Sequence, residues 1–414
     1  MNLKITGGWG CAGMNPFSGA PVLSRVKGGT SIIHPLKSQI IFTDIMPRGR
    51  KTLPDQPALR GIRGARGDPE SVAVIDIVTD VKEAEWRDYV EAMNSALWYT
   101  PEWSGFLGQT FTFPRHHLFA IDGGGAVQGF LPLFRVASRI TGDRLSSAPF
   151  TPRCGPLGEG EVRTALLTAA CRLRDNLGTK CLEIHEKADL EEFQAFDWYS
   201  THQLDLTPGP EAIRKGIVNK NIRRDLSRSE ELGLEVERSQ RPEDTEIFHR
   251  LNLQNKKALG VLCHPSRFCR NLFRCLPGLT TLYIARNHDE PVAGGIFLRY
   301  RDDIMFGYAA SAPAARHFSA TKLILWECIR DASTSGARLM DFGRVSNVNA
   351  GLIQYRKSWG AEGQKLWYSY YPAPTGCEYH TRDTSRYRLG KAAIRVLPVP
   401  LYSMLSDRYF GIFG

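Results

Sequence analysis

The sequence predicts an α/β protein made of two consecutive copies of one unit, each a mixed sheet flanked by helices. Three observations lead to this fold class. The 414 residues contain 42% hydrophobic and 23% charged residues, which is ordinary for a globular chain of two or three domains. The same order of helices and strands occurs twice. Matching glycines also recur at similar distances, Gly129 with Gly294 and Gly178 with Gly336.

The first copy follows from apolar alternation for strands and a 3.6-residue period for helices. Its predicted elements are a strand at 72–78, helices at 83–93 and 102–109, strands at 118–121, 127–136 and 145–150, a helix at 162–176 and a strand at 181–184. Short links between successive strands favour antiparallel pairing, whereas the strand–helix–strand step requires a crossover. We therefore expect a mixed sheet.

The second copy repeats this order and adds two elements. Its predicted elements are helices at 243–259 and 266–276, strands at 281–285, 292–300 and 303–310, a helix at 320–335, a strand at 339–342, a short helix at 350–359 and a strand at 365–371. The repeat of element order is the main reason to expect two domains of one fold.

Residues 1–70 are predicted to be a disordered, basic tail. They contain eleven Gly and seven Pro, and residues 1–71 carry ten Lys or Arg against four acids. The tail includes Gly8-x-Gly10-x-x-Gly13, but no strand and helix surround this dinucleotide-type motif. We expect no DNA binding, because the basic residues lack interleaved aromatics. Deleting the tail is expected to leave the fold intact.

The whole chain is predicted to be cytoplasmic, with at most peripheral contact at the inner face of a membrane. It has no apolar stretch near the ~18 residues that a spanning helix needs, and no compact signal-peptide core. Nine Cys is an odd number and does not suggest a disulfide framework. The basic and aromatic C-terminus suggests the possible membrane contact.

Several short motifs match known functional sites, but the partner motifs that those sites require are missing. Asp341-Phe-Gly343 matches a kinase magnesium motif, but the sequence lacks the catalytic and glycine-rich loops of kinases. Cys263, His264, Cys269 and Cys275 suggest zinc, but their spacing includes no Cys-x-x-Cys pair. We therefore predict buried free thiols, no metal site and no permanently bound cofactor.

A more specific set of residues lies in the second copy. It comprises residues 339–346 (LMDFGRVS), 354–360 (QYRKSWG) and 366–368 (LWY), together with 129–133 (GFLPL) in the first copy. In this order the segments resemble the FemAB-like family, whose members join two GNAT-like domains in one chain. The resemblance covers roughly residues 74–412. It is closer to the variants associated with exopolysaccharide or other envelope pathways than to the classical peptidoglycan-bridge enzymes.

The resemblance implies a division of the chain. Residues 71–212 would form a first GNAT-like domain and 213–375 a second, with 376–414 packing back on the first. We expect the first domain to be the degenerate copy, because Glu159 and Glu161 would repel a phosphate-bearing donor at its helix start. The basic segment 214–233 is interpreted either as an anion-binding rim at the junction or as a solvated helix.

The resemblance also implies transfer of an acyl group to an amine, with acyl-CoA as the expected co-substrate. GNAT enzymes bind the donor at a loop that opens a helix, and Arg316, His317, Ser319, Thr321 and Lys322 lie at that junction here. The competing interpretation is that Ser319 or Thr321 only caps the helix.

Asp341, Arg344 and Lys357 are the predicted catalytic residues. Asp341 would hold or deprotonate the amine, while Arg344 and Lys357 would bind an anionic acceptor. The alternative for the first two is a structural ion pair between Asp341 and Arg344. Tyr355 and Trp359 are expected to pack in the core.

Three functions stay open at this stage. The favoured one is an acyl-CoA-dependent N-acyltransferase acting on an amino sugar or amino acid in cell-envelope or exopolysaccharide biosynthesis. The second is an aminoacyl-tRNA-dependent aminoacyltransferase that extends a peptidoglycan precursor. The third is a non-catalytic binding module. The absence of a long helical hairpin near 214–233 argues against tRNA as a partner.

Overall fold

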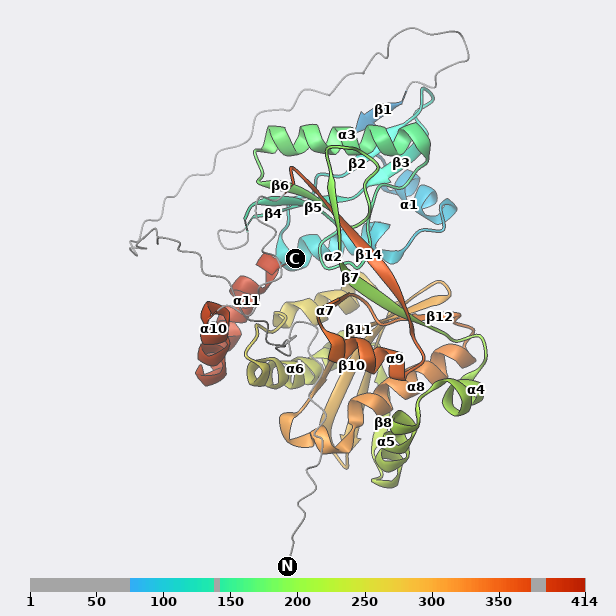
Figure 1. Ribbon diagram of the computed structural model, residues 1–414, viewed down its shortest axis with the longest axis vertical. Helices are drawn as coiled ribbons and strands as arrows, with labels where there is room; N and C mark the ends of the chain where they lie inside the picture. Colours follow the sequence, from blue (N-terminus) through green and yellow to red (C-terminus); the bar gives the residue numbers. More distant parts are fainter. Residues whose placement is uncertain (1–74, 138–141, 374–384, 414) are drawn as a thin grey trace, which may run out of the picture.

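The computed structural model describes residues 75–137, 142–373 and 385–413 (Figure 1). The predicted tail at 1–70, with its glycine motif, lies outside the described residues, as does the beginning of the strand predicted at 72–78. No helix in the described ranges is long and apolar enough to cross a membrane.

The first unit has the element order that the sequence predicts. Its elements are β1 (Asp76–Val78), α1 (Glu83–Ala92), α2 (Pro101–Phe111), β2 (Leu118–Ile121), β3 (Val127–Leu131), β4 (Leu133–Val136), β5 (Arg144–Ser147), α3 (Gly160–Leu177) and β6 (Cys181–Ile184). The strand predicted at 127–136 is split at Pro132, which has no N–H to donate to a ladder. The split moves the chain from the small β1–β2–β3 sheet into the large sheet.

The second unit repeats this order. Its elements are β8 (Glu235–Ser239), α6 (Thr245–Leu259), α7 (Ser266–Cys275), β9 (Thr280–Asn287), β10 (Glu290–Tyr300), β11 (Asp303–Ser311), α8 (Ala320–Thr334), β12 (Leu339–Asp341), β13 (Val345–Ser346), α9 (Ala350–Ser358) and β14 (Glu362–Tyr371). Two strands, β8 and the twelve-residue β7 (Gln194–Asp205), were not predicted from the sequence. Both carry polar residues that interrupt a simple apolar alternation.

The two units exchange their last strands and so share one sheet. The large sheet has the order β4-β5-β6-β14-β7-β12-β11-β10-β9-β8. β14 of the second unit lies beside β6 of the first, while β7 of the first lies beside β12 of the second. β7 and β14 also pair with each other, and Figure 1 shows them running together between the two halves of the molecule. Separating the units would break all three ladders.

Three apolar cores support this arrangement. One packs α3 on the sheet of the first unit, and a second packs α8 on the sheet of the second unit. A third core spans both units through α2 and α7, where the rings of Phe106 and Phe268 lie 5.2 Å apart. The two units therefore form one packed body. Trp359 is fully buried and Tyr355 packs against the same core, as predicted.

The helix suggested within 214–233 is α5 (Lys220–Glu231), which buries Ile222 and Leu226 against the core under α8. The cations of the segment 214–233 are balanced in part by acids. Arg214, for example, donates to Glu230 at 2.8 Å. This geometry fits the interpretation of a solvated helix on the outer face.

The C-terminal segment requires a correction. It forms α10 (Ser385–Val396) and α11 (Val399–Tyr409), which lie beside α6 of the second unit rather than on the first unit (Figure 1). The Tyr402 hydroxyl donates to the Val261 carbonyl at 2.7 Å. Contact with the first unit comes at the end of the segment, where Phe410 stacks on Phe150 with ring centres 5.7 Å apart. The beginning of the predicted segment, residues 376–384, lies outside the described ranges.

Candidate active site

The two parallel strands of the second unit separate after a short ladder. β11 pairs with β12 at Asp303–Leu339, at Ile304–Met340 and at Met305–Asp341. β11 then continues to Ser311, while the chain after Asp341 turns to β7, where the Phe342 amide donates to the His202 carbonyl at 2.9 Å. The strands therefore diverge after Met305 and Asp341.

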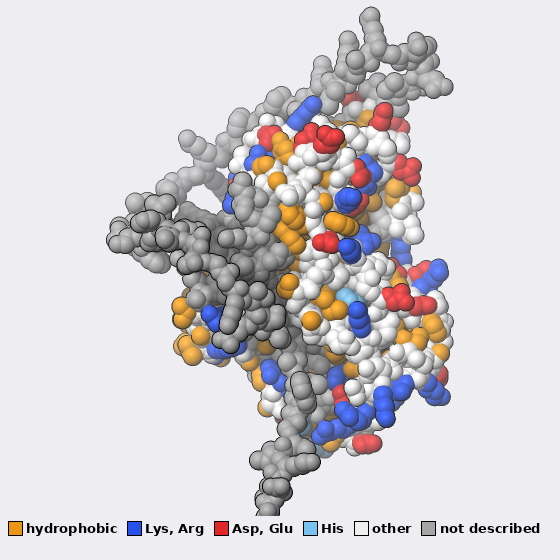
Figure 2. Space-filling model, in the orientation of Figure 1, with side chains coloured by type: hydrophobic (Ala, Val, Ile, Leu, Met, Phe, Trp, Pro, Cys, Tyr) orange, Lys and Arg blue, Asp and Glu red, His pale blue; other side chains and the backbone are white. Residues whose placement is uncertain are grey.

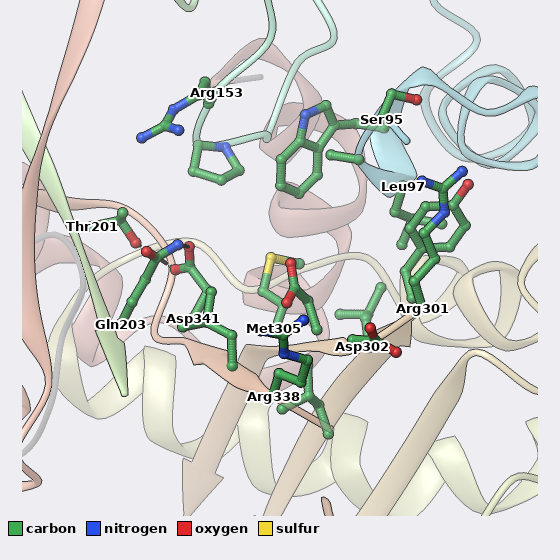
Figure 3. A pocket seen from close by; sticks show the side chains of 18 of the residues that line it. Ser95, Leu97, Arg153, Thr201, Gln203, Arg301, Asp302, Met305, Arg338 and Asp341 are labelled. Carbon is green, nitrogen blue, oxygen red and sulfur yellow. Dashed lines mark hydrogen bonds between the residues drawn. The ribbon is translucent and has the colours of Figure 1, made fainter. Parts of the chain in front are cut away.

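A cavity of about 700 Å³ opens at this point between the two units (Figure 3). Residues of the α1–α2 connection and Arg153 form its first-unit side, and the beginnings of β11 and β12 form its second-unit side. Alternating side chains of one strand share a face, so Asp303 and Met305 both face the cavity, as do Leu339 and Asp341. The remaining polar lining residues include Ser95, Thr201, Gln203, Asp205, Arg301, Asp302 and Arg338.

Asp341 is held as an acceptor of hydrogen bonds on this lining. The Thr201 hydroxyl and the Gly343 amide donate to its Oδ1, the amide at 2.6 Å, and Gln203 Nε2 donates to its Oδ2 at 3.0 Å. Figure 3 shows Thr201, Gln203 and Asp341 grouped on one side of the cavity. Three donors orient the carboxylate. Thr201 and Gln203 were not predicted, because the polar residues of β7 hide this strand in the sequence.

A second carboxylate lies on the neighbouring strand. Burial raises the pKa of Asp303, and the negative charges of Asp341 and Asp302 raise it further, whereas Arg338 opposes the shift. Because its negative charge is disfavoured, the carboxylate of Asp303 is a stronger base than an exposed aspartate. Asp303 was missed because it begins a strand after a turn, a place where an acidic residue is ordinary.

Arg344 points away from the cavity. Its Nη1 donates to the Tyr368 hydroxyl at 2.9 Å, and the guanidinium lies 4.8 Å from the centre of the Tyr199 ring. Burial alone lowers the pKa of Arg344, but the phenols of Tyr368 and Tyr199 and the charge of Glu183 raise it above its ordinary value.

Both hypotheses about Arg344 are therefore corrected. Among the contacts of the described residues, Arg344 forms no ion pair with Asp341. It does not line the cavity either, so it is not placed to bind an acceptor there. The physical reason is the turn after β12, which directs Arg344 into the junction between the two units.

Lys357 is also displaced from its predicted role. It is exposed on α9, whereas the preceding residue, Arg356, is buried. Arg356 donates to the carbonyls of Phe342 and Gly343 at 2.7 and 2.8 Å, so it fixes the turn that follows Asp341. Burial lowers the pKa of Arg356 to about 10, although Asp341 opposes the shift. Successive residues of a helix point about 100° apart, so Lys357 faces solvent when Arg356 faces the interior.

The predicted donor loop precedes α8. Arg316 and His317 are exposed on the 3₁₀ turn Pro313–Phe318, and Thr321 lies in the first turn of α8. Ser319 adopts a positive φ of 54° at the N-cap position, and its side chain makes no capping hydrogen bond. For Ser319 the interpretation as a side-chain cap is therefore wrong.

Lys322 differs from the other loop residues because it is already paired. Its ammonium group contacts Asp225 of α5, and both side chains are largely buried. The Ser229 hydroxyl of α5 donates to the Phe318 carbonyl at 2.7 Å, so α5 braces the loop. Arg316 and His317 are exposed and can therefore meet a phosphate-bearing ligand at the start of α8.

The predicted free thiols are present. Cys263 and Cys269 are buried and unpaired, and Cys275 is a half-buried free thiol. Within the part of the chain that the structure describes, no three His, Cys, Asp or Glu side chains are placed to hold a metal ion.

Comparison with known proteins agrees with this geometry. Residues 218–357 match the family model described as an acetyltransferase (GNAT) domain. No curated protein matches the chain. Among solved structures, FemX is similar over 80% of this chain and 100% of its own, with 14% identity and a TM-score of 0.57. The C-terminal domain of a putative lysylphosphatidylglycerol synthetase from Agrobacterium fabrum covers 71% of this chain and 92% of its own, with 11% identity and a TM-score of 0.50.

The resemblance that the sequence suggested is thus confirmed at the level of fold. The family match covers β11, the start of α8, β12 and most of α9, which are the elements that build the splayed strands and the donor loop. Residues 218–357 match a GNAT domain, and the described part of the chain has two units of this fold in a tandem arrangement similar to FemX.

Proposed function

We propose that the chain is a GNAT-type N-acyltransferase that moves an acyl group from an acyl-CoA to an amine bound in the junction cavity. The divergence of β11 and β12 at Met305 and Asp341 carries the proposal. The cavity lies at one end of the diverging strands, and the loop before α8 follows the other end of β11. A donor and an acceptor can therefore meet between the strands.

The charge of the cavity supports an amine as the acceptor. Four carboxylates line it, those of Asp205, Asp302, Asp303 and Asp341. Three arginines also line it, Arg153, Arg301 and Arg338, so the carboxylates exceed the guanidinium groups by one. A protonated amine would neutralise this excess of negative charge.

Asp303 is the base in the proposed reaction, and Asp341 orients the amine. Asp303 takes a proton from the bound ammonium group, and the nitrogen lone pair then attacks the thioester carbonyl. The C–N bond forms, the tetrahedral intermediate collapses, and the C–S bond breaks to release the CoA thiolate. The second proton of the nitrogen passes to solvent or to that thiolate.

The oxyanion of the intermediate needs a hydrogen-bond donor at the point where the strands separate. β11 beyond Met305 pairs with β10 on one side but no longer with β12 on the other. Alternate amides of a strand point to its two sides, so amides within Phe306–Ser311 face the gap. Such fixed donors are the ordinary means of stabilising this charge.

The same cavity weighs against the two alternative functions. An RNA acceptor end would favour a funnel lined by Lys and Arg, whereas carboxylates outnumber arginines here. A purely structural second unit would not need strands that separate beside a cavity. Transfer from acyl-CoA is thus the best-supported function. Amino sugars, the acceptors expected from envelope and exopolysaccharide pathways, form the first class to test.

The test is release of the CoA thiol from acetyl-CoA and longer acyl-CoAs in the presence of amino sugars and amino acids, with product mass measured in parallel. We expect amine-dependent thiol release and a product heavier by the acyl group. Glu290→Gln changes an exposed carboxylate that lies outside the cavity lining; it is the control and should keep full activity. Consumption of aminoacyl-tRNA without any use of acyl-CoA would overturn the proposal.

A further inference from the structure

The C-terminal hairpin of α10 and α11 exposes an unusual concentration of apolar side chains. Ten large hydrophobic residues are exposed among the described residues, and six of them lie between Leu389 and Tyr409. These six form the C-terminal patch: Leu389, Val396, Val399, Leu401, Met404 and Tyr409. Figure 2 shows hydrophobic and basic side chains together at the edge of the molecule where Figure 1 places α10.

The spacing of these residues places them on continuous helix faces. Leu389 and Val396 are seven residues apart on α10, and Leu401 and Met404 are three apart on α11. Residues at these spacings lie on one side of a helix. Val396 is 81% exposed and Leu389 is 70% exposed, so neither contributes to the folded core.

The opposite face of the hairpin is anchored to the body. Tyr402, Ser406 and Phe410 are buried, and Ser406 Oγ accepts a hydrogen bond from the Cys263 amide at 3.2 Å. Lys257 Nζ donates to the Arg395 carbonyl at the end of α10 at 2.6 Å. The hairpin therefore presents its apolar patch in a fixed orientation.

Basic residues accompany the apolar ones. Arg388, Lys391 and Arg395 recur at helical spacing on α10, and Arg408 lies four residues beyond Met404 on α11. The only acid between 385 and 413 is Asp407, whose carboxylate accepts from the Ser266 amide at 3.3 Å. The surface of the hairpin is both apolar and positively charged.

We propose that the C-terminal patch docks this protein on a membrane surface that contains anionic phospholipid. Amphipathic helices with cations beside apolar residues bind such surfaces by placing apolar side chains at the acyl boundary and cations near the phosphates. A second copy of the chain is a poorer occupant. In a two-fold contact the same cations would face each other without acids to balance them. The inference does not depend on the proposed acyl transfer.

The test is co-sedimentation of the full chain with vesicles of phosphatidylcholine alone or with 30 mol% phosphatidylglycerol, a composition chosen to mimic an anionic leaflet. We expect binding to the anionic vesicles that weakens as salt rises. Val396→Asp combined with Met404→Asp should lower the vesicle affinity at least tenfold. Val348→Asp is the matched control, because Val348 is 64% exposed but lies outside the patch.

Two further variants test how much the cations of the hairpin contribute to vesicle binding. Arg395→Gln and Arg408→Gln should each weaken binding to anionic vesicles by about fivefold, the factor that corresponds to one cation near a charged leaflet. Unchanged melting temperatures show that each variant is folded. Equal loss of binding in Val348→Asp would overturn the proposal, as would absence of wild-type binding at low salt. A dimer that dissociates in the Val396→Asp variant would assign the patch to a second copy instead.

Discussion

Glu183 in the first unit and Asp341 in the second occupy the same place in their sheets but have opposite surroundings. Each lies on the strand that follows the long helix of its unit. Each is also paired with the parallel neighbouring strand, Glu183 opposite Ser146 and Asp341 opposite Met305. An exchanged strand from the other unit flanks both. Because the sheet positions match, the two carboxylates differ mainly in the side chains and the space around them.

In the first unit the gap beside this position is closed. Glu183 is only 8% exposed, with Arg144 Nε at 3.3 Å and His185 Nε2 at 3.0 Å. Beyond it, Cys154 and His185 form a backbone bridge with N–O distances of 3.0 and 3.1 Å. The carboxylate is thus a structural element inside a sealed network.

In the second unit the strands separate, and Asp341 borders a cavity while neutral donors hold it. The same strand position is structural where Arg144 and His185 enclose the carboxylate, and it is available for chemistry where it borders a cavity. The contrast expected from the sequence depended on Glu159 and Glu161, which are exposed at the start of α3. The closed gap gives a stronger reason, and the degenerate role of the first unit stays a prediction.

The largest expected effect on stability is in the sealed network. Glu183→Gln removes the charge of a buried carboxylate that contacts both Arg144 and His185, so we expect a loss of about 3–5 kcal/mol in the free energy of unfolding. Asp341→Asn is the matched change in the open unit and should cost about 1 kcal/mol or less, because its donors are neutral. Urea unfolding of both variants measures the difference. Equal losses of unfolding free energy in the two variants would contradict the difference between a sealed first unit and an open second unit.

Arg356 and Lys357 sharpen the comparison within the open unit. Arg356→Ala deprives two carbonyls of their donor next to Asp341, and we expect a cost of about 2–3 kcal/mol together with lower activity. Lys357→Ala should stay within about 0.5 kcal/mol of wild type, because the side chain is exposed. Thermal unfolding and thiol release test both. A larger effect at Lys357 would restore its predicted role.

A smaller effect is expected for Arg344. Arg344→Ala loses its hydrogen bond to Tyr368 and its contacts with two phenol rings, which together are worth about 1–2 kcal/mol of stability. The KM for the amine should be unchanged, because Arg344 lies outside the cavity. A normal melting temperature combined with a raised KM would contradict the observed placement and favour anion binding.

The pH dependence follows from the raised pKa of Asp303. As the base, Asp303 must be deprotonated, so the rate should rise with pH through its raised pKa. The folded state also binds this proton more tightly than the unfolded state does. The contribution of Asp303 to stability is therefore greatest below its unfolded pKa and is lost as pH rises through the folded pKa. Asp303→Asn should abolish both dependences, and a wild-type-like pH profile in this variant would exclude Asp303 as the base.

Much of the fold was predictable because local patterns agree with it. Helices such as 162–176 and strands such as 303–310 carry clear periodicity, and the repeat of element order revealed two units. The exchange of β7 and β14 was not predictable, because strand pairing between distant segments leaves no local signal. The polar residues of β7 concealed it further.

The candidate site was predicted only in part. Asp341 and the donor loop follow from motif positions at the ends of elements. Asp303, Thr201 and Gln203 join Asp341 only through strand pairing across the sheet. The roles assigned to Arg344 and Lys357 failed because sequence spacing does not fix the direction of a side chain in a turn or on a short helix.

The most direct measurement is kcat/KM for acyl transfer to one amine acceptor by Asp303→Asn and Glu183→Gln, under conditions where both are folded. We predict a fall of about 10²–10⁴-fold for Asp303→Asn with little change in melting temperature. Glu183→Gln should keep near-wild-type kcat/KM per folded molecule. Full activity in Asp303→Asn, or a selective loss of catalysis in folded Glu183→Gln, would contradict the claim that chemistry occurs in the open second unit.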